Sequence, residues 1–187
     1  MTAAILCGGQ GRRLGNLDKA SISFRGQRLI DRISLLAERI TSKVIWVEKE
    51  PHRLSSTPGR VYHRVGDHSV GGAVGALLSA LNFIHHQASH GPEDTHNENV
   101  VDHWCLVLAC DLPLITPHEL QSLTQSIKGA SSQVQCIALS MTQTPQPLCA
   151  CWRSSAASLL LKHCEEGGRL TTFVERFGIT LPIEEFG

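Results

Sequence analysis

Short apolar runs alternate with stretches of helical spacing along most of this chain, and this alternation limits the fold more than any other feature. The first run, residues 3–7, is followed by two glycines and suits a strand buried on both faces. Apolar residues recur at helical spacing over residues 28–40, before a second strand-like run at 44–47. The order repeats at residues 60–65, 73–84 and 104–109. Such alternation predicts a Rossmann-like, three-layer α/β/α fold with a mostly parallel central sheet.

The second half of the chain continues the pattern and contains a clear helix start. Thr116 is a candidate N-cap, Pro117 follows at the first helical position, and Glu119 stands at the third. This arrangement predicts a helix over residues 116–127. Strands are predicted at 134–140 and 148–152, and helices at 154–164 and 170–177.

Length and charge limit the domain count and the partners. With 187 residues, of which 42% are hydrophobic, the chain suits one domain over residues 1–187, with a polar surface insertion at about 88–101. Lysine and arginine together number 17, as do aspartate and glutamate, so no net field attracts nucleic acid or an anionic membrane. Neither a signal peptide nor a transmembrane run is evident. We therefore expect a cytoplasmic protein that binds neither nucleic acid nor membrane.

Cysteines and histidines raise the questions of disulfides and zinc. The seven cysteines are odd in number, contain no CxxC pair and are spread over strand-like runs. Of the ten histidines, five lie in or beside the polar insertion, at positions 85, 86, 90, 96 and 103, and no cysteine shares a ligand spacing with them. We expect buried, reduced thiols and no zinc site.

A loop rich in glycine and basic residues follows the first strand. Between Leu6 and Lys19 the chain holds four glycines, two arginines and the lysine itself. Glycines let backbone N–H groups approach phosphate oxygens and converge into an anion-binding nest. A P-loop would need Gly-Lys-Ser/Thr at its end, and a dinucleotide fingerprint would need glycine in place of Leu14. The loop therefore predicts polyphosphate binding by another kind of site, against the alternative of a tight turn with solvated arginines.

Two aspartates stand just beyond predicted strands. Asp111 follows the run 104–109, and ligands in open α/β sheets bind at the carboxyl edge of the strands. A carboxylate there suits Mg²⁺, which takes one or two carboxylates and completes its shell with phosphate oxygens and water. Asp67 follows the run 60–65 and precedes a glycine-rich helix start. The alternatives are a helix-capping aspartate for Asp111 and an ordinary turn for Asp67.

These motifs, in this order, resemble those of the molybdenum cofactor guanylyltransferases, which are MobA-like nucleotidyltransferases. Residues 6–19 are similar to the family's LAGGxxxRMGxxDK signature, with Cys7 for alanine and Leu14 for methionine. Residues 110–114 resemble the CDxPl element, whose aspartate binds the metal. Residues 67–77 resemble a D(x)n-GPlaGl element, although Gly72 replaces its proline. Residues 146–150 resemble the QPL(x)A segment that faces the pterin.

The resemblance covers residues 4–178 and implies a fold of the nucleotide-diphospho-sugar transferase type. It implies transfer of GMP from GTP to the phosphate of molybdopterin, with Mg²⁺ as cofactor. It also implies, as partners, proteins that make or accept the molybdenum cofactor. The implied catalytic residues are Arg13, Lys19 and Asp111, and Asp111 is the implied metal ligand. The implied nucleotide-binding residues are Leu6, Cys7, Gly8, Gly9, Gly11, Arg12, Lys19, Asp67, Gly72 and Asp111. Gln146 and Pro147 are implied for the second substrate.

Two departures from the family pattern keep alternatives open. Glu48 stands where relatives often have an asparagine, and an acid there would repel a phosphate. Relatives also close with a strand bearing an NxNTPEDL-like segment, which the printed sequence lacks at residues 183–187. One alternative is a nucleotide-binding relative without turnover. Another is a nucleotidyltransferase for a different substrate, using CTP or a sugar 1-phosphate, because the motifs do not choose between guanine and cytosine.

Overall fold

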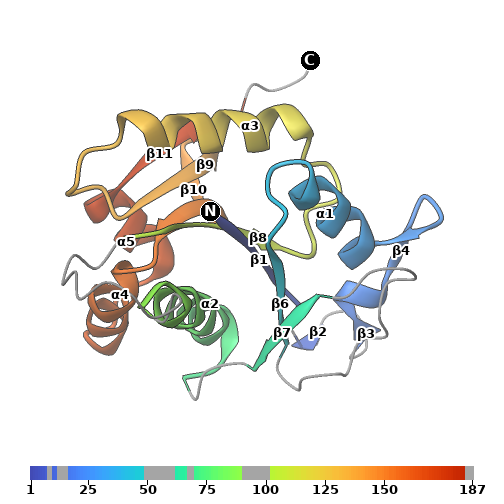
Figure 1. Cartoon of the computed structure of the whole chain (residues 1–187), viewed down its shortest axis with the longest axis horizontal. Helices are drawn as coiled ribbons and strands as arrows, with labels where there is room; N and C mark the ends of the chain where they lie inside the picture. Colours follow the sequence, from blue (N-terminus) through green and yellow to red (C-terminus); the bar gives the residue numbers. More distant parts are fainter. Residues whose placement is uncertain (8–9, 12–16, 49–61, 67–69, 90–101, 184–187) are drawn as a thin grey trace.

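A seven-stranded sheet forms the centre of the molecule in the computed structural model, which describes residues 1–7, 10–11, 17–48, 62–66, 70–89 and 102–183 (Figure 1). The strand order is β11-β9-β10-β8-β1-β6-β7. The strands are β1 Thr2–Leu6, β6 Val44–Glu48, β7 His63–Gly66, β8 Trp104–Ala109, β9 Cys136–Met141, β10 Thr144–Arg153 and β11 Gly178–Pro182. Two small sheets pair β2 (Gln10–Gly11) with β3 (Leu17–Asp18) and β4 (Ser23–Phe24) with β5 (Gln27–Arg28).

The sheet is mostly parallel, as predicted. Strand β1 runs parallel to β6 and β8, β6 runs parallel to β7, and β11 runs parallel to β9. Strand β10 is antiparallel to both of its neighbours, β8 and β9. Among the strands of this sheet that the structure describes, β10 alone opposes the common direction.

Helices cover both faces of the sheet. They are α1 Leu29–Glu38, α2 Gly72–Ser89, α3 Pro117–Ser126, α4 Ala156–Glu165 and α5 Leu170–Phe177, with short 3-10 turns η2 (Lys19–Ser21) and η3 (Ile127–Gly129). Because successive strand residues point to opposite faces, β1 gives Ala3 and Ile5 to one core and Ala4 and Leu6 to the other. Helices α1 and α3 pack on the first face, and α2, α4 and α5 on the second (Figure 1). The three-layer α/β/α prediction is confirmed.

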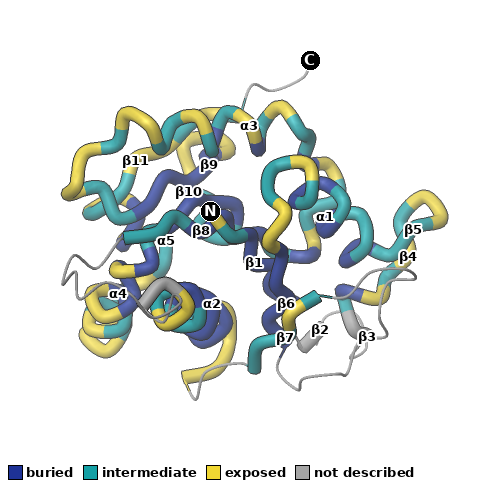
Figure 2. The backbone as a smooth tube through the Cα atoms, viewed as in Figure 1, coloured by how far each residue is buried: buried dark blue, intermediate teal, exposed yellow. Residues whose placement is uncertain are grey.

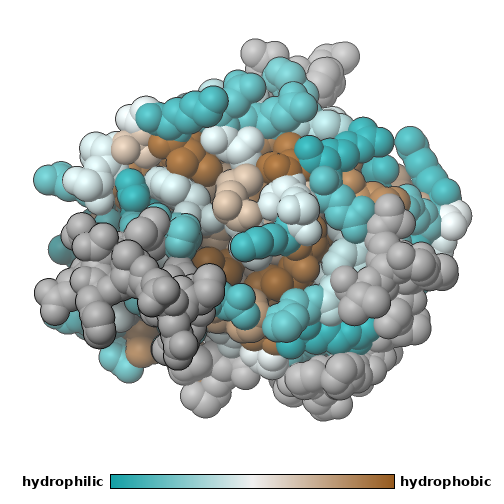
Figure 3. Space-filling model, viewed as in Figure 1, coloured by the Kyte–Doolittle hydropathy of each residue, from teal (hydrophilic) through white to brown (hydrophobic). Residues whose placement is uncertain are grey.

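Burial follows these layers closely. The central strands β1, β6 and β8 are buried along most of their length (Figure 2). Helix α3 buries Leu120 and Leu123 toward the sheet, whereas hydrophilic side chains lie along its outer side, at the top of the view in Figure 3. Among the described residues, no helix combines the length and apolar character needed to span a membrane.

The predicted start of α3 is confirmed in detail. The hydroxyl of Thr116 accepts the Glu119 backbone N–H at 3.4 Å, and the Glu119 carboxylate accepts the Thr116 backbone N–H at 2.7 Å. This reciprocal capping box satisfies two backbone donors at the helix start, and Pro117 supplies a preformed first position. The residue types that predicted the helix therefore make the contacts that begin it.

The thiols also lie where the sequence analysis put them. All seven cysteines are free, and six are buried, while Cys164 is half-buried. Burial raises the pKa of the Cys149 thiol to about 12, with a smaller contribution from the charge of Glu119. Burial also raises the pKa of the Cys105, Cys136 and Cys151 thiols, so at neutral pH these side chains and Cys149 are uncharged groups of the core.

Several boundaries differ from prediction. Helix α2 extends through residue 89 instead of ending at 84, so residues 88–89 of the expected insertion belong to it, and 90–101 lie outside the described residues. Strand β10 begins at Thr144, so Gln146 and Pro147 lie inside a strand. A register shift between Gln146 and Ala150 accommodates this proline-containing stretch, since proline cannot donate to a strand ladder.

The hairpin that precedes β10 and the strand that follows α5 were not predicted. Thr142 and Gln143 connect β9 to β10 with φ of 48° and 65°. This conformation is usually taken by asparagine and glycine, so these two residue types are not a turn signal. Strand β11 pairs with β9 at the sheet edge and is largely exposed or half-buried, so it has no continuous apolar run. A closing strand is therefore present after residue 177.

Candidate active site

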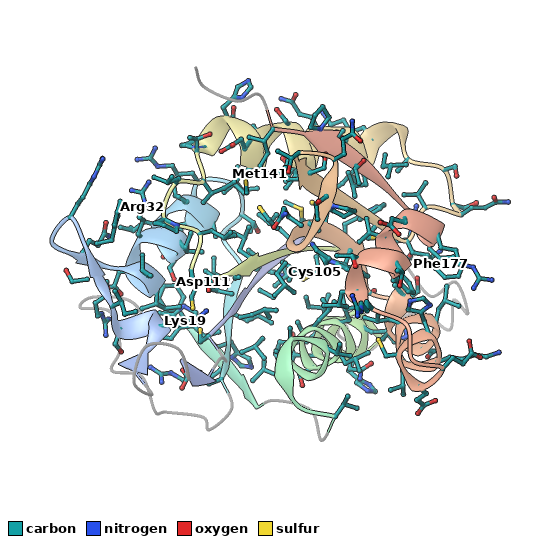
Figure 4. All side chains as sticks on the ribbon, turned by 180° about the vertical axis from the view of Figure 1, so that it is seen from behind. Lys19, Arg32, Cys105, Asp111, Met141 and Phe177 are labelled. Carbon is teal, nitrogen blue, oxygen red and sulfur yellow. The ribbon has the colours of Figure 1, made fainter. Side chains whose placement is uncertain are left out.

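The carboxyl ends of β1 and β8 bring Lys19 and Asp111 together. Leu6 and Ala109, the last residues of these strands, are register partners, so the chain after each strand leaves from the same edge of the sheet. Lys19 Nζ lies 2.7 Å from Asp111 Oδ2, although 92 positions separate the two residues (Figure 4). Their side chains are 37% and 42% exposed. Two residues predicted to be catalytic thus form an ion pair that solvent can reach.

The segment after Asp111 is held by contacts with neighbouring elements. Arg32 of α1 donates from Nε to the backbone carbonyl of Pro113 at 2.8 Å, and the backbone N–H of Ile115 donates to the Leu112 carbonyl. The capped start of α3 follows directly. Sequence reasoning did not single out Arg32, because its contact lies 81 positions away and no local motif marks it. These bonds fix the course of the backbone that presents the Asp111 carboxylate.

A cavity of about 700 Å³ opens beside Asp111. Gln146 and Pro147 of β10 line it, as do Gly168 and Arg169 at the start of α5. Its volume lies within the range of small-molecule sites in proteins, roughly 300–1,000 Å³. The structure therefore places the residues predicted for the second substrate in the same cavity as the predicted metal ligand.

A different cavity, of about 620 Å³, lies at the opposite, amino-terminal edge of the central strands. Met1, Lys43, His63 and His103 are among its lining residues. It contains none of the predicted site residues. Because the predicted chemistry gathers at the carboxyl edge, we assign the site to the cavity beside Asp111.

The nucleotide-binding predictions fall partly inside the described residues. Leu6 and Cys7 are 3% and 9% exposed at the end of β1, so they can offer a ligand mainly their backbone. Gly11 lies in β2.

Gly72 opens α2 with φ of +64°, which proline, restricted to about −65°, cannot adopt. Proline could therefore not replace Gly72 without a change in the backbone at the start of α2. Gly8, Gly9, Arg12, Arg13 and Asp67 lie outside the described residues.

Glu48, the acid that stands where relatives often have an asparagine, is paired with an arginine. Its side chain, 2% exposed at the end of β6, accepts from Arg64 Nη1 at 3.0 Å. The Arg64 guanidinium also lies 5.2 Å from the centre of the Trp46 ring. Trp46 and Arg64 are register partners of β6 and β7, so the pairing follows from strand register and was invisible in the sequence. Arg64 therefore offsets the charge that would repel a phosphate.

The donor set fits a metal that arrives with a nucleotide. Over the described residues, no group of three or more histidine, cysteine, aspartate or glutamate side chains could hold a metal ion by itself. Asp111 offers one carboxylate, with Oδ2 on Lys19. Mg²⁺ commonly takes only one or two protein carboxylates and relies on substrate phosphates and water for its other ligands.

Comparisons with known proteins agree over nearly the whole chain. The model of the MobA-like NTP transferase domain matches residues 3–178. A probable molybdenum cofactor guanylyltransferase of Nostoc sp. is 26% identical over 172 residues, 90% of this chain and 73% of that protein. One from Clostridium perfringens is 24% identical over 186 residues, 99% of this chain and 82% of that protein.

Solved structures show the same fold. Molybdopterin-guanine dinucleotide biosynthesis protein A from Archaeoglobus fulgidus superposes with a TM-score of 0.68 at 22% identity, covering 99% of this chain and 85% of that one. The 2-C-methyl-D-erythritol 4-phosphate cytidylyltransferase of Francisella tularensis gives 0.60 at 12% identity, covering 99% and 92%. The fold is thus that of nucleotidyltransferases of the nucleotide-diphospho-sugar transferase type, and the chain belongs to the family of MobA-like NTP transferase domains.

Proposed function

We propose that this protein transfers GMP from GTP to the terminal phosphate of molybdopterin and releases pyrophosphate. The observation that carries the proposal is the ion pair of Lys19 and Asp111 at the edge of a cavity that Gln146 and Pro147 also line. The names of the relatives from Nostoc and Clostridium perfringens support the choice of substrates. The nucleotide would lie on the side of the loop after β1, and the pterin in the cavity.

The chemistry needs alignment and charge neutralisation. A phosphate nucleophile is already an anion, so no general base has to remove a proton from it. This agrees with the wall of the cavity, where Cys149 is a neutral thiol at physiological pH because burial raises its pKa to about 12. Lys19 would place its ammonium against the phosphates, and Arg13 would do the same from the loop.

Asp111 and Lys19 can exchange partners at little cost. Because both side chains are more than a third exposed, their ion pair contributes at most about 1 kcal/mol. Lys19 can therefore turn to a phosphate oxygen while Asp111 turns to Mg²⁺. When bound, Mg²⁺ would supply positive charge to the triphosphate and to the leaving pyrophosphate. Arg32, through Pro113, keeps the backbone of Asp111 in place during this exchange.

One observation favours an alternative, a nucleotide-binding relative without turnover. Strand β11 reads Gly-Ile-Thr-Leu-Pro, and neither it nor the printed residues after it contain the asparagines of the family's closing segment. Strand β11 therefore supplies no asparagine side chain to the metal or the nucleotide. A transferase that uses CTP or a sugar 1-phosphate is the remaining alternative.

The deciding experiment measures affinity and turnover in the same sample. Calorimetry compares GTP, CTP and ATP with and without Mg²⁺, and pyrophosphate release is then followed after molybdopterin is added. Selective GTP binding with release supports the proposal. Binding without release supports the silent relative, and CTP selectivity supports the cytidylyl alternative.

Asp111→Asn provides the residue-level test of the metal site. We expect Mg²⁺-dependent release to fall at least about 100-fold, because a metal ligand should matter no less than the groups that merely orient one. Direct Mn²⁺ binding in the presence of GTP should fall as well. Glu175→Gln, an exposed acid-to-amide change in α5, is the matched control. Wild-type activity of Asp111→Asn would remove Asp111 from the metal site.

A further inference from the structure

The connection between α4 and α5 forms one wall of the cavity beside Asp111. Helix α4 ends in two backbone hydrogen bonds. The Gly167 N–H donates to the Cys164 carbonyl at 3.0 Å, and the Gly168 N–H donates to the His163 carbonyl at 2.9 Å. Gly167 has φ of +86°, the left-handed conformation of this helix stop. Only Gly168 and Arg169 separate Gly167 from the start of α5 at Leu170, so this short connection has little freedom to change its conformation.

The imidazole of His163 is packed against this connection. A Cβ added to Gly168 would overlap the His163 ring, so only glycine leaves room for it. His163 Nε2 lies 3.2 Å from the Arg169 carbonyl oxygen and 3.1 Å from Thr172 Oγ1. The ring is further flanked, edge to face, by Phe173. The side chain is therefore held in one orientation.

The hydrogen bonds around His163 Nε2 indicate that this nitrogen is a donor. The Thr172 hydroxyl accepts the Arg169 backbone N–H at 3.0 Å and donates to the Arg169 carbonyl at 2.9 Å. Because the Thr172 hydroxyl proton is donated to the Arg169 carbonyl, it is not available to His163. His163 Nε2 is therefore the N–H donor toward the Arg169 carbonyl and the Thr172 hydroxyl oxygen. The backbone of Arg169, where α5 starts, is thus tied to α4 by a side chain that does not line the cavity.

We propose that His163 is a positioning residue for the second substrate. Through its contacts with Gly168 and Arg169 it sets the position of residues 168–171, which line the same cavity as Asp111. The inference rests on the proposed function, which puts the pterin substrate in this cavity. A positioning role predicts an effect on the second substrate alone, whereas a purely structural role predicts a loss of stability without such selectivity.

The primary test compares KM and kcat in three variants. For His163→Ala we expect the KM for molybdopterin to rise about fivefold to tenfold, the size of losing one or two ordinary hydrogen bonds. The KM for GTP and the kcat at saturation should stay within twofold of wild type. His163→Gln, whose amide nitrogen can donate from a similar position, should restore most of the affinity. His118→Ala, at an exposed position of α3, is the matched control.

A double-mutant cycle makes the test sharper. Gly168→Ala should raise the same KM in the wild-type background, because the new Cβ displaces the imidazole. In the His163→Ala background the overlap is gone, so Gly168→Ala should add little further effect. Additive effects of the two substitutions would overturn the inference.

Hydrogen exchange at the first turn of α5 separates the outcomes. Faster exchange in His163→Ala together with the selective rise in KM supports positioning. Faster exchange with unchanged KM, or equal changes for GTP and molybdopterin, reduces His163 to a structural role and overturns the inference. If wild-type protein releases no pyrophosphate at all, the proposed function itself fails, a result distinct from any that depends on the variants.

Discussion

Gly178→Ala tests the junction between α5 and the edge strand β11. Gly178 follows the last residue of α5, donates its N–H to Val174, and pairs with Cys136 of β9 as the first residue of β11. A Cβ at this position would lie 2.6 Å from Cys136 Sγ, 2.8 Å from the Cys136 carbonyl oxygen and 2.9 Å from the Val174 carbonyl oxygen. The backbone has φ of −124°, so lack of space, and not an unusual conformation, requires glycine.

The expected cost follows from what the new methyl group meets. Two of the three atoms are backbone oxygens, which no change of rotamer can move, so β11 must shift away from β9 or α5. Overpacking of this kind costs typically 1–3 kcal/mol, and we expect about 2–3 kcal/mol. For a domain of this size such a loss lowers Tm by about 5–10 °C.

Thermal and urea unfolding followed by circular dichroism measure this loss. Gly129→Ala is the matched control, because nothing lies within 4 Å of its added Cβ. That change should be neutral or stabilising by up to about 1 kcal/mol, since alanine restricts the unfolded chain. Because only one of the three contacts is to sulfur, combining Gly178→Ala with Cys136→Ala should not restore wild-type stability. A Tm for Gly178→Ala within 1 °C of that for Gly129→Ala would refute the reasoning.

Three further predictions follow from charges and thiols. Lys19→Met should weaken GTP binding about tenfold or more, because it removes a hydrogen bond from a charged group. It should change stability by no more than about 1 kcal/mol, because the ion pair with Asp111 is exposed. Unchanged GTP affinity in calorimetry would contradict this prediction. Arg64→Met should lower the free energy of unfolding in urea by about 3–5 kcal/mol, because buried Glu48 loses the guanidinium that pairs with it. Adding Glu48→Gln should recover part of this loss. Strictly additive effects of the two substitutions would argue against the ion pair. Burial raises the pKa of Cys136 to about 12, so the folded state keeps a proton that the unfolded state loses near pH 9. The contribution of this thiol to stability should therefore be constant below about pH 9 and be lost as the pH rises toward about 12. Between about pH 9 and 12 the stability of the wild type should fall more steeply than that of Cys136→Ala, and equal slopes in urea midpoints would count against this.

The sequence alone determined the elements whose signals are local. Buried strands and amphipathic helices follow from apolar periodicity, which requires only neighbouring residues, and β8 was predicted at its observed bounds. The start of α3 followed from Thr116, Pro117 and Glu119, because a capping box spans only four positions. The place of Asp111 after a strand predicts that it is a site residue, and this stays a prediction. Composition predicts a phosphate-binding loop after β1, and this stays a prediction, because its glycines and arginines at 8–9 and 12–13 lie outside the described residues.

Which of these residues come into contact depends on the tertiary structure. Lys19 contacts Asp111 because β1 and β8 are adjacent in the sheet, and strand order depends on how whole elements pack, which no local pattern records. The reversed direction of β10 brings Gln146 and Pro147 to the cavity, and the pairing of β6 with β7 gives Glu48 its arginine. The same holds for Arg32, Gly178 and His163, whose importance comes from atoms contributed by other elements. Periodicity specifies which face of an element is buried, but the partner on the other side is set by packing in three dimensions.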